Sequence, residues 1–140
     1  MLAEIDEQPS GARRKELVSE MISQLRLHAA IEEAIFYPAI RAEVTDGDVL
    51  AYRGIQDHQC VKEALARLER LDLNDHEAEL ILLQLKNDMR EHMEEEEGVV
   101  FAAVRAEMDT ARLAEMGRAV VKAKKDGFSR PHASARSWEA

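Results

Sequence analysis

The sequence predicts an all-α protein: an up-down helical bundle of three long helices followed by one short helix. Two observations support this fold class. The chain of 140 residues is rich in strong helix formers and contains only six glycines and three prolines. Its apolar residues recur every three or four positions, and no segment shows the strict alternation of a strand. A chain of this length is expected to form one domain with its own core.

Breakers and turn residues divide the chain into four helical segments. A Pro-Ser-Gly cluster precedes the first helix, Pro38 is expected to end or kink it, and a Thr-Asp-Gly-Asp turn precedes the second. Asn74 and Glu77 resemble a capping box for the third helix, and Asp109 or Thr110 caps the fourth. The predicted helices cover residues 12–43, 49–71, 75–107 and 110–125. They form a helical domain of residues 12–126, between a lead-in of residues 1–11 and a flexible tail of residues 127–140 that starts at a C-capping Gly127.

The charge and cysteine content exclude several classes of protein. The net charge is −9, and such an acidic chain argues against nucleic acid as a partner. The single cysteine, Cys60, cannot form an internal disulfide, which fits a reducing compartment. The first ten residues have no apolar signal-peptide core, and no apolar run approaches the roughly 20 residues that cross a membrane. We therefore expect a cytoplasmic protein with no nucleic-acid or membrane partner.

The inward face of each long helix is an apolar stripe interrupted by polar residues. The stripes consist of Leu17, Met21, Leu25, His28, Glu32, Ile35 and Ala39; of Ala51, Ile55, His58, Val61, Leu65 and Leu68; and of Leu82, Leu85, Met89, His92, Glu96, Val99 and Ala103. The interruptions are three histidines and two glutamates near the middle of each stripe. A carboxylate in a core costs several kcal/mol unless it is paired or bound to a cation. One core histidine alone would more often be satisfied by a neighbour, but five such residues at one depth favour a shared metal centre.

The spacing of these residues suits metal ligation. A histidine and a glutamate four residues apart lie on the same helix face, so both can reach one centre. Di-iron bundles of the ferritin-like type use a related Glu and His spacing on facing helices. Imidazole with carboxylate suits iron, manganese or zinc, and a lone Cys60 cannot build a structural thiolate zinc site.

An internal repeat doubles this motif. Residues 28–43 read HAAIEEAIFYPAIRAE, and residues 92–107 read HMEEEEGVVFAAVRAE, with seven identical positions when they are aligned without gaps. Both copies carry the His-x-x-x-Glu module. Two such helices facing each other would bring Glu32 and Glu96 to the centre, where each carboxylate could bridge two metals.

The chain resembles the hemerythrin-like family of HHE cation-binding domains over roughly residues 12–125. The motifs that carry the resemblance are His28-x-x-x-Glu32-Glu33 with Phe36-Tyr37-Pro38, then Asp57-His58, then His92 with Glu94 to Glu97 and Phe101. The resemblance implies a four-helix bundle around a carboxylate- and oxo-bridged di-iron centre. It implies that the terminal iron ligands are His28, His58 and His92 and that the bridging carboxylates are Glu32 and Glu96. Such centres bind dioxygen reversibly in some members, and in others they sense oxygen, nitric oxide or iron or protect against oxidative stress.

Two departures from the family pattern affect the expected site. Family members usually begin with a further helix carrying an Asp-His pair, whereas the 27 residues before His28 contain no histidine. Lys62 stands four residues after His58, where the oxygen carriers have another histidine. One iron is therefore expected to be short of protein ligands, so that water completes the site, or one metal or none is bound. The fourth helix is a candidate to cover the groove that a missing first helix would leave.

Residues next to the predicted ligands are expected to have structural roles. We expect the neighbouring carboxylates to be solvated, because only one residue of a helical turn can share the ligand face; these are Glu33, Glu94, Glu95 and Glu97. The aromatic residues expected to pack around the site and exclude water are Phe36, Tyr37 and Phe101.

Three functions are compatible with the sequence. The leading one is a non-haem iron protein that binds or senses dioxygen, nitric oxide or iron. The second is a di-iron oxidoreductase or stress-protection enzyme, although the sequence shows no separate substrate site. The third is a metal-free bundle that acts as an interaction module, whose exposed apolar stripe a homodimer or another protein would cover.

Overall fold

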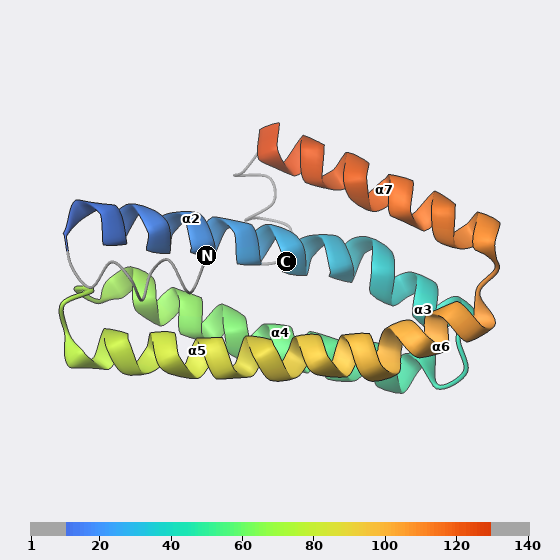
Figure 1. Ribbon diagram of the computed structural model, residues 1–140, viewed down its shortest axis with the longest axis horizontal. Helices are drawn as coiled ribbons and strands as arrows, with labels where there is room; N and C mark the ends of the chain where they lie inside the picture. The colour runs from blue at the N-terminus through green and yellow to red at the C-terminus, as the bar shows by residue number, and fades with distance from the viewer. Residues whose placement is uncertain (1–10, 130–140) are drawn as a thin grey trace.

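The computed structural model describes residues 11–129 and shows a bundle that is helical throughout this range apart from short turns (Figure 1). The first rod consists of α2 (Ala12–Ile31), the π-helical turn η1 (Glu32–Phe36) and α3 (Tyr37–Glu43); the second is α4 (Gly47–Arg70); the third consists of α5 (His76–Glu95), the π-helical turn η2 (Glu96–Val100) and α6 (Phe101–Glu107). Each rod reverses the direction of the one before it, and the last helix, α7 (Thr110–Ser129), folds back along the first rod. The predicted all-α up-down bundle is confirmed. The predicted lead-in up to residue 10 and the predicted tail from residue 130 lie outside the described residues.

The turns between the rods show why the helices end where they do. Between α3 and α4 the chain passes through Asp46, whose φ of 60° lies in the left-handed region. At Gly47 a Cβ would come within 1.8 Å of the carbonyl oxygen of Ile40, so only glycine fits this close approach. Asp109 caps α7 as predicted, because its carboxylate accepts the backbone N–H of Arg112 at 2.7 Å.

Two predicted helix caps do not form. Helix α5 has Asp75 at its N-cap without a side-chain capping bond, so the capping box expected from Asn74 and Glu77 does not form. Helix α7 has 20 residues and continues through Gly127, which keeps a helical backbone rather than the left-handed conformation of a C-cap. The fourth helix is therefore longer than predicted.

The two π-helical turns occupy the same place in the two copies of the repeat. Each turn begins at the glutamate of the His-x-x-x-Glu module and contains one residue more than an α-helical turn. In η1 the N–H of Tyr37 bonds the carbonyl oxygen of Glu32, and in η2 the N–H of Phe101 bonds that of Glu96. The sequence repeat is thus also a repeat of backbone structure.

At the end of each π turn the buried residue stands one position later than a regular helical spacing predicts. Val99, which a regular helical spacing predicts to face inward, is 51% exposed, and Val100 is 5% exposed instead. The prediction for Val99 is wrong because a 3.6-residue repeat cannot anticipate an inserted residue. Pro38 does not end the first rod, since it falls in the first turn of α3. It is also not the cause of the π turn, because Ala102 stands at the same place in the second copy.

Two apolar clusters lie on either side of the polar centre. One joins α2, α4 and α5 and includes Leu17, Met21, Leu65, Leu68 and Leu85. The other joins the far ends of the rods to α7 and includes Phe36, Tyr37, Ile40, Ala51, Val104 and Met116. Because both clusters are closely packed, they fix the separation of the rods and hence the positions of the polar side chains between them.

Helix α7 covers only one side of the first rod. It contacts α2 and η1, and Figure 1 shows it beside the first rod and away from α4. Met116 of α7 is buried in the second apolar cluster, whereas Val121 further along the helix is 67% exposed. In the range of residues 11–129, no helix has the length and apolar character needed to span a membrane.

Candidate metal centre

All five residues predicted to bind metal lie in one cluster at the middle of the bundle. The first rod supplies His28 and Glu32, α4 supplies His58, and the third rod supplies His92 and Glu96. Their donor atoms form two groups, each within 4.8 Å: Glu32 with His58 and His92, and His28 with Glu32 and Glu96. Glu32 belongs to both groups, so its carboxylate is common to the two sets of donors.

Short distances join these donor atoms. Oε1 of Glu32 lies 2.6 Å from Nε2 of His28 and 3.3 Å from Nε2 of His58. Nε2 of His92 lies 3.1 Å from Oε1 of Glu96. All three histidines thus present the same ring nitrogen to the carboxylates at the centre.

Further carboxylates contact the outer nitrogens of the two buried histidines. Nδ1 of His92 lies 2.8 Å from Oδ2 of Asp57, and Nδ1 of His58 lies 3.4 Å from Oε2 of Glu33. Glu33 also accepts a hydrogen bond from Nζ of the buried Lys62 at 3.0 Å. A carboxylate at Nδ1 keeps the imidazole proton there and leaves Nε2 free to bind a metal. The prediction that Glu33 is a solvated charge is wrong.

Tyr37 reaches the centre as well, although the sequence predicts only a packing role for it. Its side chain is 1% exposed, and its hydroxyl group donates a hydrogen bond to Oε1 of Glu96 at 3.2 Å. The hydroxyl oxygen of Tyr37 also lies 3.4 Å from Nε2 of His58. The one signal that points to this contact is Gly54, one turn before His58, where a Cβ would come within 2.2 Å of the tyrosine oxygen.

The charges in the cluster compensate one another. Burial alone would raise the pKa of Glu32, but the neighbouring histidines outweigh burial and hold that pKa below its ordinary value. Burial raises the pKa of Glu96, and the nearby charge of Glu32 raises it further. Burial would lower the pKa of His92, but Glu96 and Asp57 outweigh it and raise that pKa to about 9. Without a cation, the cluster therefore holds a proton on His92 and a negative charge on Glu32 at neutral pH.

Two buried atoms show that the cluster fits a cation. Oε1 of Glu32 and Nε2 of His92 are buried without a hydrogen-bond partner among the described residues, because their short contacts lack hydrogen-bond geometry. Each unsatisfied buried polar atom costs about 1–3 kcal/mol. A cation at the centre would satisfy both atoms at once. The imidazole nitrogens and carboxylate oxygens of the cluster are ligands that suit iron, manganese or zinc.

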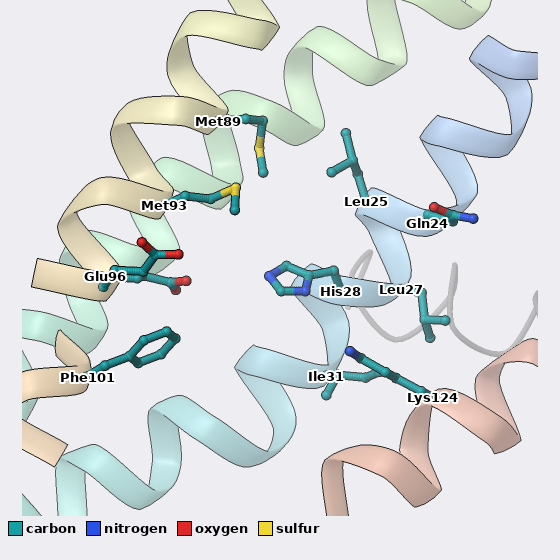
Figure 2. A pocket seen from close by; sticks show the side chains of 11 residues that line it. Gln24, Leu25, Leu27, His28, Ile31, Met89, Met93, Glu96, Phe101 and Lys124 are labelled. Atoms are coloured by element: carbon teal, nitrogen blue, oxygen red, sulfur yellow. The ribbon is translucent and has the colours of Figure 1, made fainter. Parts of the chain in front are cut away.

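An open groove leads to one side of the cluster. It has a volume of about 610 Å³ and lies between α2, α5 and the last turns of α7. Figure 2 shows His28 on one wall facing Glu96 on the other, with Met89 and Met93 beside Glu96. Among the described residues, helix α7 contributes Lys124 to the lining of this groove. The side chain of His28 is 47% exposed, whereas that of His92 is 5% exposed.

Comparison with known families agrees with this geometry. Residues 1–104, most of the chain, match the family described as hemerythrin HHE cation binding domain. The matched range contains all five clustered residues and both His-x-x-x-Glu modules. Comparison with curated proteins and with solved structures gives no match. The chain belongs to the hemerythrin HHE cation-binding domain family.

Proposed function

We propose that the cluster binds two non-haem iron ions and that the iron-loaded protein takes up a diatomic ligand, dioxygen or nitric oxide. The observation that carries this proposal is the sharing of Glu32 between two donor groups. A carboxylate with two oxygens can serve two metals. Membership of a cation-binding family supports the metal, and a donor set of nitrogen and oxygen without thiolate supports iron.

The side chains have distinct tasks in this proposal. His28, His58 and His92 would be the terminal ligands of the iron, and the carboxylates of Glu32 and Glu96 would be shared between the two ions. Asp57 and Glu33 orient the two buried imidazoles through their Nδ1 atoms. When bound, the iron pair supplies a reducible centre for a small ligand. The groove beside His28 admits such a ligand from solvent, while the two apolar clusters enclose the centre along the length of the bundle.

Metal analysis tests the binding step. The chain is expressed with iron, purified, and analysed for metal per protomer by mass spectrometry together with His28→Ala and Glu96→Ala. His76→Ala is the matched control, because the His76 side chain is 81% exposed at the start of α5. We expect about two irons per chain in the wild type and the control, and a loss of iron in both cluster variants. A wild-type protein without metal would refute the proposal and favour the interaction module.

Ligand binding is tested separately on reduced, iron-loaded protein. We expect the absorption spectrum to change on exposure to dioxygen or nitric oxide and to differ in the His28→Ala variant, because His28 stands at the groove. A spectrum that neither gas alters would contradict the binding role even if iron is present.

The groove supports a second candidate, an oxidoreductase that acts on a small apolar molecule. Its volume of about 610 Å³ falls within the range of roughly 300–1,000 Å³ of ligand pockets. Most of its lining is apolar, and His28 and Glu96 lie on its walls. Consumption of peroxide or of an apolar substrate by the iron-loaded protein would support this role. A spectrum that responds to gas without any turnover would count against it.

A further inference from the structure

The hydroxyl oxygen of Tyr37 lies among atoms that face the centre. It is 3.2 Å from Oε1 of Glu96 on the third rod and 3.4 Å from Nε2 of His58 on α4. Both of these atoms belong to the predicted ligand groups, and the phenol comes from the remaining rod. A buried tyrosine hydroxyl needs only one polar partner. This hydroxyl instead contacts two atoms of predicted metal ligands, Oε1 of Glu96 and Nε2 of His58, which come from different helices.

These distances match those between ligands of one cation. Two donors that are each about 2.1 Å from a metal lie roughly 3.0–3.4 Å apart at octahedral or tetrahedral angles. The distance of 3.4 Å to His58 falls in this range, as does that of 3.3 Å between His58 and Glu32. The phenol oxygen is thus placed like a member of the ligand set.

The backbone of two helices holds the phenol in this position. Tyr37 follows η1 directly, and its N–H closes the π turn on the carbonyl of Glu32, so the turn that begins at Glu32 also places the tyrosine. On α4 the ring rests against Gly54, where any Cβ would overlap the hydroxyl at 2.2 Å. Glycine within a helix costs about 1 kcal/mol relative to alanine. In the second copy of the repeat the corresponding residue is Phe101, which has no hydroxyl, so the two copies are not equivalent.

We propose that the phenol oxygen of Tyr37 is a metal ligand, completing the position formed by Glu32, His58 and His92. The proposal deepens the proposed function, on which it rests. In the binding step the phenol O–H bond breaks and an oxygen–metal bond forms, with no transfer of electrons. Before Glu96 itself binds metal, its Oε1, which already accepts the hydroxyl hydrogen bond, takes up the proton and passes it to solvent through the groove that Glu96 lines. Iron(III) is a hard cation and suits an anionic oxygen ligand.

Spectroscopy of the iron-loaded protein tests this ligand directly. A phenolate bound to iron(III) gives a visible charge-transfer band, and resonance Raman excitation in that band shows the ring vibrations of tyrosine. We expect both signals in the wild type and the loss of both in Tyr37→Phe, with the iron content retained. Tyr52→Phe is the matched control, because Tyr52 is 62% exposed; both signals should persist in it. Ring-deuterated tyrosine in the wild type should shift the vibrations, which keeps the test independent of how the variants fold.

The possible outcomes distinguish the ligand role of Tyr37 from the binding of iron by the cluster. Iron in the wild type without tyrosine vibrations, or vibrations that persist in Tyr37→Phe, would overturn the ligand role and leave the proposed function standing. Absence of iron from the wild type would overturn both. Loss of the band in Tyr37→Phe with unchanged iron content would establish the ligand.

Discussion

Raising the pH should destabilise the metal-free protein through His92. In the folded chain the pKa of His92 is about 9, against an ordinary value of 6.5, because Glu96 and Asp57 outweigh the effect of burial. A group whose pKa is raised by folding stabilises the fold fully below its unfolded pKa and loses that effect as the pH passes its folded pKa. The stability that His92 contributes is therefore present below pH 6.5 and lost by about pH 9.

The size of this loss follows from the pKa difference. A rise from 6.5 to about 9 corresponds to about 3 kcal/mol of unfolding free energy. Solvent screening reduces this little, because the side chain is 5% exposed. The pKa of Glu96 and that of His58 are raised as well, so both groups act in the same direction and His92 sets a lower limit to the loss. Glu32, whose pKa is lowered, stays ionised over this range and does not add to the slope.

Urea unfolding measures the effect. The metal-free protein is unfolded in the presence of a chelator at about pH 6 and about pH 9.5, where the free energy of unfolding should differ by at least about 3 kcal/mol. His92→Gln should reduce this difference by about 3 kcal/mol, whereas the matched variant His76→Gln should keep it, because that side chain is 81% exposed. A wild-type free energy of unfolding that stays constant or rises with pH would refute the charge arrangement derived for the cluster.

Three further sets of substitutions test other features. Asp57→Asn should lower metal affinity roughly 10–100-fold in a chelator competition without changing the number of ions bound at saturation, because it weakens the contact that orients a buried imidazole. Gly54→Ala should destabilise the fold by about 1–3 kcal/mol, since its Cβ overlaps the buried phenol. Gly117→Ala, with no atom within 4 Å, should instead stabilise the fold by up to about 1 kcal/mol. In urea unfolding Val100→Ala should cost about 2 kcal/mol and Val99→Ala less than about 0.5 kcal/mol; equal costs would contradict the register shift at η2.

The helices could be predicted because their signals are local. Apolar spacing and turn residues depend on neighbours in the sequence, and these place three rods and a fourth helix correctly to within a few residues. The register after each π turn could not be predicted this way. Val99 and Val100 are both apolar β-branched residues, and only the inserted residue in the turn decides which of them is buried.

The clustering of five polar residues could be predicted because each interrupts an apolar stripe. Their surroundings could not, since these depend on which side chain of a neighbouring helix stands opposite. Glu33 lies beside the apolar stripe of its own helix, so the sequence alone predicts that it is solvated. In the structure it accepts a hydrogen bond from Lys62 on the neighbouring helix α4. The sequence predicts only a packing role for Tyr37, whereas in the structure its hydroxyl group donates a hydrogen bond to Glu96. A sequence pattern detects polar atoms on apolar faces, but it does not detect a polar end on a mostly apolar side chain.

The two copies of the His-x-x-x-Glu module lie in different surroundings, and this difference is chemically useful in the proposed centre. His92 is buried with Asp57 on its outer nitrogen, whereas His28 is 47% exposed at the groove. Helix α4 packs closely on α5 and supplies both Asp57 and His58, while α7 leaves the groove beside α2 open. In the proposed centre, one metal position would therefore be held by buried ligands, and the other would meet solvent at the exposed imidazole of His28. The opening on the His28 side results from how α4 and α7 pack, because the module itself is the same in both copies, and the proposed centre would take up its ligand there.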